Sequence, residues 1–276
     1  MASLKNRFLF TVPMLMLAAV LVGGCSGGDP GTYQGYIEGE YVYVASPIGG
    51  SLTNLLVARG DSVKAGQLLF ALERQSELAA LDQAKKNLDQ SKANLVLAES
   101  TYKRRKELRE NPSEVISAEE LDQARMQLDT STADVASQKA ALDKAKWSYD
   151  QKEQFAPADA QVHDTLYRQG EYVVAANPVV VLLPPENIKV RFFVPQGDLP
   201  KIKIGGTVSV QCDGASHPYD ATVNYISTQA EYTPPVIYSR ETRANLVFMI
   251  EARFAPTNAI SLRPGQPAEV QLEAAR

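Results

Sequence analysis

The residues best suited to nucleophilic or metal chemistry in this 276-residue chain are two cysteines and two histidines. His163 and His217 are far apart in the sequence, and neither has the spacing of a zinc site or of a Ser/His/Asp set. Cys212 lies in the apolar alternation Val-Ser-Val-Gln-Cys, which predicts an inert core thiol. The sequence has no glycine-rich phosphate loop of the P-loop type, so a partner would have to supply any ATP hydrolysis. We therefore expect a protein that is not an enzyme and has no catalytic residue, metal or cofactor.

Cys25 has a different context, because it follows an apolar segment near the N-terminus. Lys5 and Arg7 precede a mostly apolar run from Phe8 to Val22, which is short for a membrane span and typical of a signal-peptide core. The residues Leu-Val-Gly-Gly-Cys at positions 21–25 resemble a bacterial lipobox, whose cysteine is diacylated on sulfur and becomes the new N-terminus. A plain secretory signal or an uncleaved anchor is the alternative interpretation.

We expect residues 1–24 to be a signal peptide and Cys25 to be the lipidation site. Residues 25–35 then form a lipid-anchored tether, since a segment rich in Ser and Gly favours a flexible chain. Two or three acyl chains hold a protein on a bilayer far more firmly than one. The mature protein is therefore expected on a membrane surface.

The remaining composition is that of an ordinary globular protein, with 45% hydrophobic and 22% charged residues. The formal net charge of −4 does not favour nucleic acid as a partner.

A short β-type motif occurs twice, in residues 46–72 and again in residues 156–183. When Gly60 is aligned with Gly170, most apolar positions of the two copies coincide, and both glycines are expected to be turn residues with positive φ. Neither copy is long enough to bury a core alone. The repeat therefore predicts one small β-domain that is split by an insertion.

The insertion, residues 75–154, has the pattern of two helices. Large residues recur every seven positions in each helix, and small residues recur at an offset of three; the large ones are Leu81, Leu88, Leu95 and Tyr102, then Leu121, Leu128, Val135, Leu142 and Tyr149. Ser117 and Glu120 form a capping box at the start of the second helix. An intermolecular coiled coil is the alternative, but the proline break before this cap favours an antiparallel hairpin on the order of 50 Å long.

The last part, residues 187–276, contains short apolar runs separated by Gly, Pro and Asn, which predict a small β-barrel or sandwich. A polar loop, residues 231–243, includes Tyr232, Thr233 and Pro234. This loop is either a contact loop for a transporter or another protomer, or a long surface turn.

This order of parts resembles the periplasmic adaptors, or membrane fusion proteins of the HlyD type. The resemblance rests on the lipobox, a half-motif ending Gly-Asp-Ser-Val-Lys-Ala-Gly-Gln-Leu-Leu, the hairpin, and a second half opening Phe-Ala-Pro-Ala-Asp-Ala-Gln-Val. It implies an elongated α+β fold. In that fold a biotinyl/lipoyl-like β-domain, residues 36–74 and 155–186, carries the inserted coiled-coil hairpin and is followed by the barrel.

The resemblance also implies contact residues. The hairpin tip of the family presents an Arg, a Leu four positions later and a Ser at the start of the second helix to an outer-membrane duct; Arg104, Leu108 and Ser117 are the matching positions. The loop from Arg109 to Ile116 is longer than the usual pattern. Residues 230–248 are similar to a stretch typical of adaptors of ABC-type exporters.

The function implied is that of a non-catalytic adaptor between an inner-membrane exporter, with the ABC type favoured, and a TolC-like outer-membrane protein. The partners implied also include further copies of the chain in a ring, taken as hexameric. Periplasmic localisation on the inner membrane follows from the architecture, whereas Ser26 after the lipidated cysteine leaves the outer membrane open. The alternatives are an adaptor of a proton-driven resistance-type pump and, from another class, a lipoyl/biotinyl-type carrier. In such a carrier the modified lysine lies on a hairpin between the two halves; here the helical insertion occupies that position, and Lys64 lies in the Gly-Asp-Ser-Val-Lys-Ala-Gly-Gln turn instead.

Overall fold

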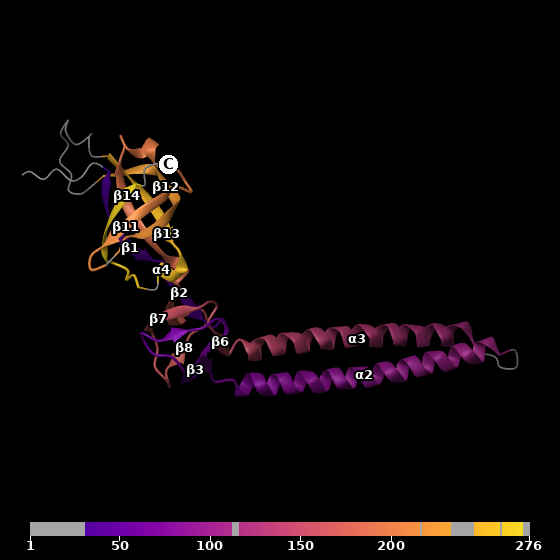
Figure 1. Cartoon of the computed structure of the whole chain (residues 1–276). Coiled ribbons are helices and arrows are strands. Elements are labelled where there is room, and N and C mark those ends of the chain that lie inside the picture. The colour runs from indigo at the N-terminus through magenta and orange to yellow at the C-terminus, as the bar shows by residue number, and fades with distance from the viewer. Residues whose placement is uncertain (1–30, 112–115, 216, 233–245, 260, 273–276) are drawn as a thin grey trace, which may run out of the picture. The chain divides into compact units, whose positions relative to one another are not determined.

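The computed structural model describes residues 31–111, 116–215, 217–232, 246–259 and 261–272. Two compact units make up the chain, as Figure 1 shows. One unit runs from Gly39 to Ile188, and the other contains the chain up to Glu38 and from Lys189 onward. The predicted signal peptide, Cys25 and the first part of the tether lie outside the described residues.

The β part of the first unit consists of two four-stranded sheets, in the orders β2-β9-β7-β4 and β6-β5-β3-β8. Their strands are β2 Val42–Ala45, β3 Gly50–Leu55, β4 Ser62–Val63, β5 Leu68–Leu72, β6 Glu153–Phe155, β7 Ala160–Thr165, β8 Tyr172–Val173 and β9 Pro178–Leu183. Each sheet contains strands from before and after the helices. Leu52 and Phe70 from the first half pack in one core with Val162 and Leu182 from the second, as expected for a domain split by an insertion.

The two halves pair with each other reciprocally. The N–H of Gly60 donates to the carbonyl of Val162 at 2.9 Å, and the N–H of Gly170 donates to the carbonyl of Leu52 at 2.8 Å. These bonds relate positions that the repeat aligns. The ten residues that follow each glycine also have the same order of buried and exposed side chains. The repeat thus forms one domain with approximate two-fold symmetry.

Backbone conformation at the turns agrees with the repeat as well. Gly60 has φ 95° and Gly170 has φ 93°, as predicted for both glycines. Gly66 of the first half has φ 78°, and its counterpart Ala176 has φ 65°. Ala176 therefore holds a left-handed conformation that side chains disfavour.

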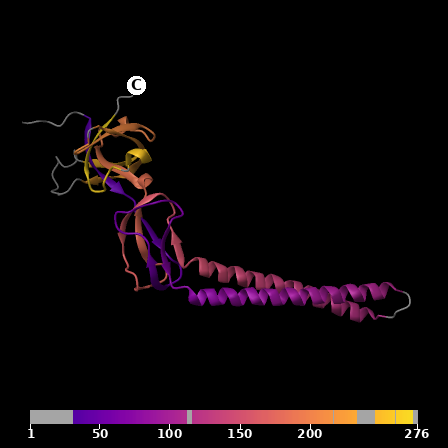
Figure 2. The ribbon, with the colours of Figure 1, turned by 60° about the horizontal axis from the view of Figure 1, so that its bottom comes forward.

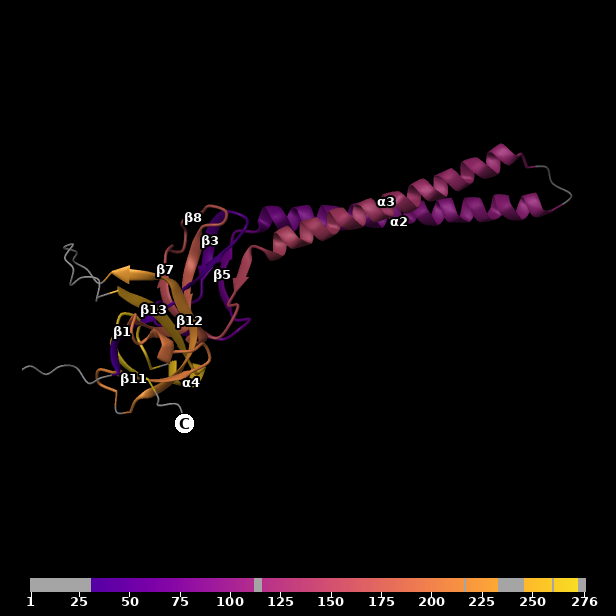
Figure 3. The same cartoon turned by 90° about the horizontal axis from the view of Figure 1, so that it is seen from above.

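The insertion is a pair of long antiparallel helices, α2 Gln75–Glu110 and α3 Ala118–Asp150, which lie side by side in Figures 2 and 3. At about 1.5 Å per residue, α2 is about 50 Å long. The buried residues of both helices belong to the predicted seam: Leu81, Leu88, Ser91, Ala98, Ala124 and Ser131. The heptad pattern therefore identified the face along which the helices pack.

The second unit is a closed barrel with strand order β1-β10-β13-β12-β11-β14. Its strands are β1 Thr32–Gly39, β10 Ile188–Pro195, β11 Thr207–Cys212, β12 Tyr219–Tyr232, β13 Leu246–Phe254 and β14 Pro267–Leu272. Two short helical segments accompany them, η2 Leu199–Lys201 and α4 Pro256–Ala259, while η1 Pro185–Asn187 lies at the end of the first unit. Fully buried side chains fill the barrel, including Ile37, Phe192 and Ile250. Cys212 is 1% exposed, and burial together with the nearby Asp213 carboxylate raises the pKa of its thiol, in keeping with an inert core residue.

Strand β1 corrects one predicted boundary. Residues 32–35 were expected in the tether and residues 36–39 in the lipoyl-like domain, but all of them lie in β1, which pairs antiparallel with β14 of the barrel. Tyr33 and Ile37 are buried there. A Cβ atom on Gly35 would lie 2.5 Å from the carbonyl oxygen of Arg191, so glycine at this position lets β1 approach β10 closely.

The C-terminal end of the hairpin is the other corrected boundary. The insertion was expected to end at residue 154, but α3 ends at Asp150 and residues 153–155 form strand β6, which pairs with β5. The carbonyl of Lys152 accepts a hydrogen bond from the N–H of Leu72 at 2.8 Å. The chain has therefore rejoined the sheet before residue 154.

Candidate partner-binding surface of the helical hairpin

A buried lysine holds the base of the hairpin. Lys152 is 3% exposed, and its Nζ donates to the carbonyl of Gly49 at 2.8 Å. The same Nζ lies 3.0 Å from Oε1 of Glu77. A buried ammonium is stable only when it is paired and hydrogen-bonded. These contacts tie the first turn of α2 and the residues after α3 to the loop before β3.

Further contacts at the base join the helices to each other and to the β-domain. The Arg74 guanidinium lies 2.7 Å from Oε1 of Glu153 and over the ring of Tyr149, 4.8 Å from its centre. The hydroxyl of Ser46, which is fully buried, lies 2.8 Å from the carbonyl oxygen of Gln151 and can donate to it. The base of the hairpin is thus fixed by several polar contacts of different kinds.

At the far end of the hairpin, the predicted capping box starts α3. The N–H of Glu120 donates to Oγ of Ser117 at 3.2 Å, and the N–H of Ser117 donates to Oε2 of Glu120 at 3.2 Å. Both bonds satisfy backbone donors that the first turn of a helix leaves unpaired. Ser117 therefore has a structural role in addition to its predicted contact role.

The three predicted contact residues all lie near this end. Arg104 and Ser117 are exposed, and Leu108 is half-buried in the last turn of α2. The N–H of Asn111 closes that turn on the carbonyl of Leu108 at 3.2 Å. Residues 112–115 of the enlarged loop lie outside the described residues. This end of the hairpin therefore presents an exposed cation and a partly exposed leucine.

Arg105 is a residue that the sequence analysis missed. Its Nη1 donates to the carbonyl of Glu120 at 2.9 Å and so joins α2 to the first turn of α3. The signal was present in the sequence, because Arg105 follows Ser91 and Ala98 in the seven-residue recurrence of small seam positions. The neighbouring Arg104 is exposed, and Arg105 makes this contact across the hairpin.

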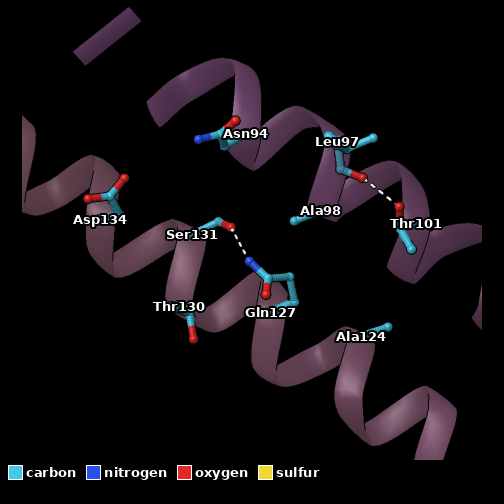
Figure 4. Close-up of a pocket in the computed structure, with 9 residues that line it drawn as sticks. All are labelled: Asn94, Leu97, Ala98, Thr101, Ala124, Gln127, Thr130, Ser131 and Asp134. Carbon is cyan, nitrogen blue, oxygen red and sulfur yellow. Dashed lines mark hydrogen bonds between the residues drawn. The ribbon is translucent and has the colours of Figure 1, made fainter. Parts of the chain in front are cut away.

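Between its base and its tip, the hairpin has a groove of about 500 Å³, shown in Figure 4. The groove is lined by Asn94, Leu97, Ala98 and Thr101 of α2 and by Ala124, Gln127, Thr130, Ser131 and Asp134 of α3. The small seam residues leave this space, and Leu97 beside it is 68% exposed. Gln127 Nε2 donates to Oγ of Ser131 across one turn at 3.3 Å. The lining combines apolar and uncharged polar side chains with one charged residue, Asp134.

The barrel carries a separate cluster of charges. Nζ of Lys189 lies 2.7 Å from one oxygen of Glu251, and Nη2 of Arg191 lies 2.8 Å from the other oxygen and 2.8 Å from Glu38. Burial opposes ionisation of Glu251, but the hydrogen bonds from Lys189 and Arg191 outweigh it and lower the pKa of the carboxyl. These groups pair with one another, so the cluster has the character of a structural network.

The other predicted contact loop lies mostly outside the described residues. Tyr232 is the last residue of β12, and Thr233 and Pro234 are not described. Among the described residues, no group of three or more His, Cys, Asp or Glu side chains could hold a metal ion.

Comparison with known proteins agrees with this architecture. Residues 74–152 match the family described as RND MFP, alpha-helical hairpin domain. The UPF0194 membrane protein YbhG of Salmonella gallinarum is 26% identical, over 97% of this chain and 98% of its own length. Among solved structures, the membrane fusion protein Spr0693 of Streptococcus pneumoniae has a TM-score of 0.64 at 18% identity, covering 89% of this chain and 99% of its own. MacA of Actinobacillus actinomycetemcomitans has a TM-score of 0.60 at 17% identity, covering 88% and 80%.

The resemblance to the membrane fusion proteins is confirmed. The membrane fusion protein fold accounts for the split repeat, since its helical hairpin is inserted into the β-domain. In the described part of this chain, none of the helices is long and apolar enough to cross a bilayer.

Proposed function

We propose that this chain is a non-catalytic periplasmic adaptor that links an inner-membrane exporter to a TolC-like outer-membrane duct. The helical hairpin carries the proposal, because its sequence matches the hairpin domain of membrane fusion proteins and its far end exposes Arg104. An exposed cation beside a partly exposed leucine supplies charge and an apolar anchor, the two features from which protein interfaces gain specificity.

An ABC-type exporter is the inner-membrane partner that we favour. The support is the similarity of residues 230–248 to adaptors of such exporters, together with the lipobox at Cys25. A proton-driven pump of the resistance type is the second candidate, and the match to an RND adaptor hairpin favours it. Co-purification of the native complex decides between them: an ATPase subunit supports the first partner, and a proton-driven permease without an ATPase excludes it.

The anchor is proposed to be a lipid on Cys25, with the protein in the periplasm and held on the inner membrane. Mass spectrometry of the membrane-extracted protein should find a diacylated N-terminal Cys25, and an unmodified N-terminus or retained Met1 would exclude the anchor. Assembly into a ring, which we take to be hexameric, is measured on the same detergent-solubilised material by native mass spectrometry. A monomer under conditions that preserve the lipid anchor would contradict the ring.

The tip residues test the adaptor function directly. Leu108→Ser and Arg104→Asp should lower the free energy of unfolding by about 1 kcal/mol or less, because neither residue is in the buried seam. Both changes should nevertheless reduce site-specific crosslinking to the duct. The matched controls are Leu95→Ser and Leu142→Ser, which alter half-buried seam leucines and should lower the melting temperature. Tip variants that crosslink and export normally would remove the proposed contact.

A further inference from the structure

One end of the barrel exposes an apolar side chain beside lysines. Ile204 is 70% exposed, which makes it the most exposed large apolar residue among those described. It lies in the turn before β11, between the exposed Lys203 and Gly205, whose φ of 84° allows the chain to turn sharply. Lys201, one turn earlier, has a side chain that is 65% exposed and pairs with Asp198 at 2.6 Å.

A backbone hydrogen bond fixes the position of this turn. The N–H of Gly205 donates to the carbonyl of Val223 at 2.8 Å, which holds the turn against β12. We call Lys201, Lys203 and Ile204 the rim. An exposed aliphatic side chain beside lysines is a combination that proteins place at a membrane interface.

Strand register puts the rim at the end of the barrel where the N-terminal strand begins. Thr32 pairs with Gln271 of β14, and Val208 at the start of β11 pairs with the next residue, Leu272. The turn that carries Ile204 leads directly into β11. Thr32 and the rim therefore share one end, whereas α4 and its neighbours lie at the other end, where β13 finishes and β14 starts.

We propose that the rim rests on the membrane surface, with Ile204 entering the headgroup region and Lys203 facing lipid phosphates. The inference rests on the proposed lipid anchor for its orientation. Thr32 is seven residues after Cys25, and at about 3.3–3.6 Å per residue the tether spans at most about 25 Å. An anchor on so short a tether brings this end of the barrel, rather than the other, to the bilayer.

The chemistry of the rim fits a lipid surface. Burial of an exposed isoleucine in the headgroup and acyl boundary is favourable, and a lysine nearby gains from anionic lipids. Lys201 contributes less charge, because Asp198 neutralises it. The expected contact is therefore mainly apolar, with a salt-dependent part that comes from Lys203.

The experiment measures how deeply single labelled positions of the protein enter the membrane of lipid vesicles. The lipidated full chain carries an environment-sensitive fluorophore on Ile204→Cys, or on Thr257→Cys as the matched control, since Thr257 is exposed in α4 at the opposite end. Cys212 is buried and should not be labelled. Vesicles of phosphatidylcholine and phosphatidylglycerol contain a lipid quencher in the headgroup region. Fluorescence at position 204 should be blue-shifted and quenched, and fluorescence at position 257 should not change.

A second experiment tests the membrane contact of the rim independently of the proposed lipid anchor. If the lipidated chain does not float with vesicles, the anchor is wrong, and the mature chain from Ser26 with an N-terminal histidine tag is held on nickel-chelating lipids instead. Quenching at position 204 in that experiment still supports the rim. Lys203→Glu should reduce the quenching on anionic vesicles. A position 204 that stays unquenched in both experiments overturns the proposal and indicates that the rim faces water or a protein partner.

Discussion

Ala176 holds a backbone conformation that its side chain disfavours, while the equivalent residue of the first half is Gly66. Both residues are exposed turn positions, and a Cβ atom on Gly66 would meet no neighbour within 4 Å. The difference between them is therefore one of backbone strain. Their hydrogen bonds are also equivalent, since both N–H groups donate at 2.8 Å across the two halves.

Ala176→Gly should raise the free energy of unfolding by about 0.5–1 kcal/mol, because relief of left-handed strain outweighs the greater entropy of the unfolded chain. Gly66→Ala should lower it by about 1 kcal/mol. Ala175→Gly is the control; its φ is not positive, so this change should be slightly destabilising. Urea unfolding measures all three, and a stabilising control would contradict the strain argument.

Glu251 predicts a pH dependence of barrel stability. Its pKa in the folded protein is lowered, so its contribution is complete above the unfolded value of about 4.3 and is lost as the pH falls through the folded value. Glu251→Gln should therefore be less stable than the wild type at pH 7. The difference should narrow as the pH is lowered from 5 toward 3 in urea titrations. A difference that stays constant over this range would show that the lowered pKa does not contribute to stability.

At the scale of elements, the hairpin is stabilised differently along its length. The middle is held by packing of a heptad seam, the tip by a capping box and Arg105, and the base by buried polar contacts. The base is the most sensitive of these regions to substitution, because removal of one partner from a buried ion pair leaves the other charge uncompensated.

Lys152→Ala should destabilise the first unit by about 3 kcal/mol, since Lys152 is buried between Gly49 and Glu77. The matched control is Lys85→Ala, whose partner Asp82 is exposed; it should change the free energy of unfolding by about 0.5 kcal/mol or less. Differential scanning calorimetry of both variants gives the comparison. If both variants lose the same free energy of unfolding, the buried Lys152–Glu77 pair stabilises the protein no more than an exposed pair does.

At the scale of the whole molecule, the hairpin should be removable from the domain that carries it. A variant that lacks residues 79–146 and closes the gap with a short Gly-Ser turn keeps Arg74, Glu77, Tyr149 and Lys152. It should fold, since the β-domain core comes from the two repeat halves, yet it should not crosslink to the duct. Removal of residues 75–154 should be far more harmful, because it deletes Lys152 and most of strand β6.

Circular dichroism and thermal melts check the two deletions, and duct crosslinking is measured on the shorter one. If the variant lacking residues 79–146 does not fold, the hairpin must contribute to the folding of the β-domain. If both deletions melt alike, β6 is dispensable to the sheet.

The sequence by itself determined the split domain and the hairpin, because local or repeated residue patterns predict both. Apolar residues at every seventh position indicate one face of a helix, and two matching motifs 110 residues apart indicate two equivalent halves of a domain. The turn glycines Gly60 and Gly170 and the Ser117 cap could be predicted for the same reason, since each depends on only a few neighbouring residues.

Only the tertiary structure decided where β1 belongs and what Lys152 does. Strand β1 pairs with β14, at the opposite end of the chain, and no local pattern reports a partner so distant in sequence. Lys152 appears as an ordinary charge after a helix until the fold buries it against the loop before β3. Interactions between distant segments depend on the packing of the whole domain, and so they are absent from any short stretch of sequence.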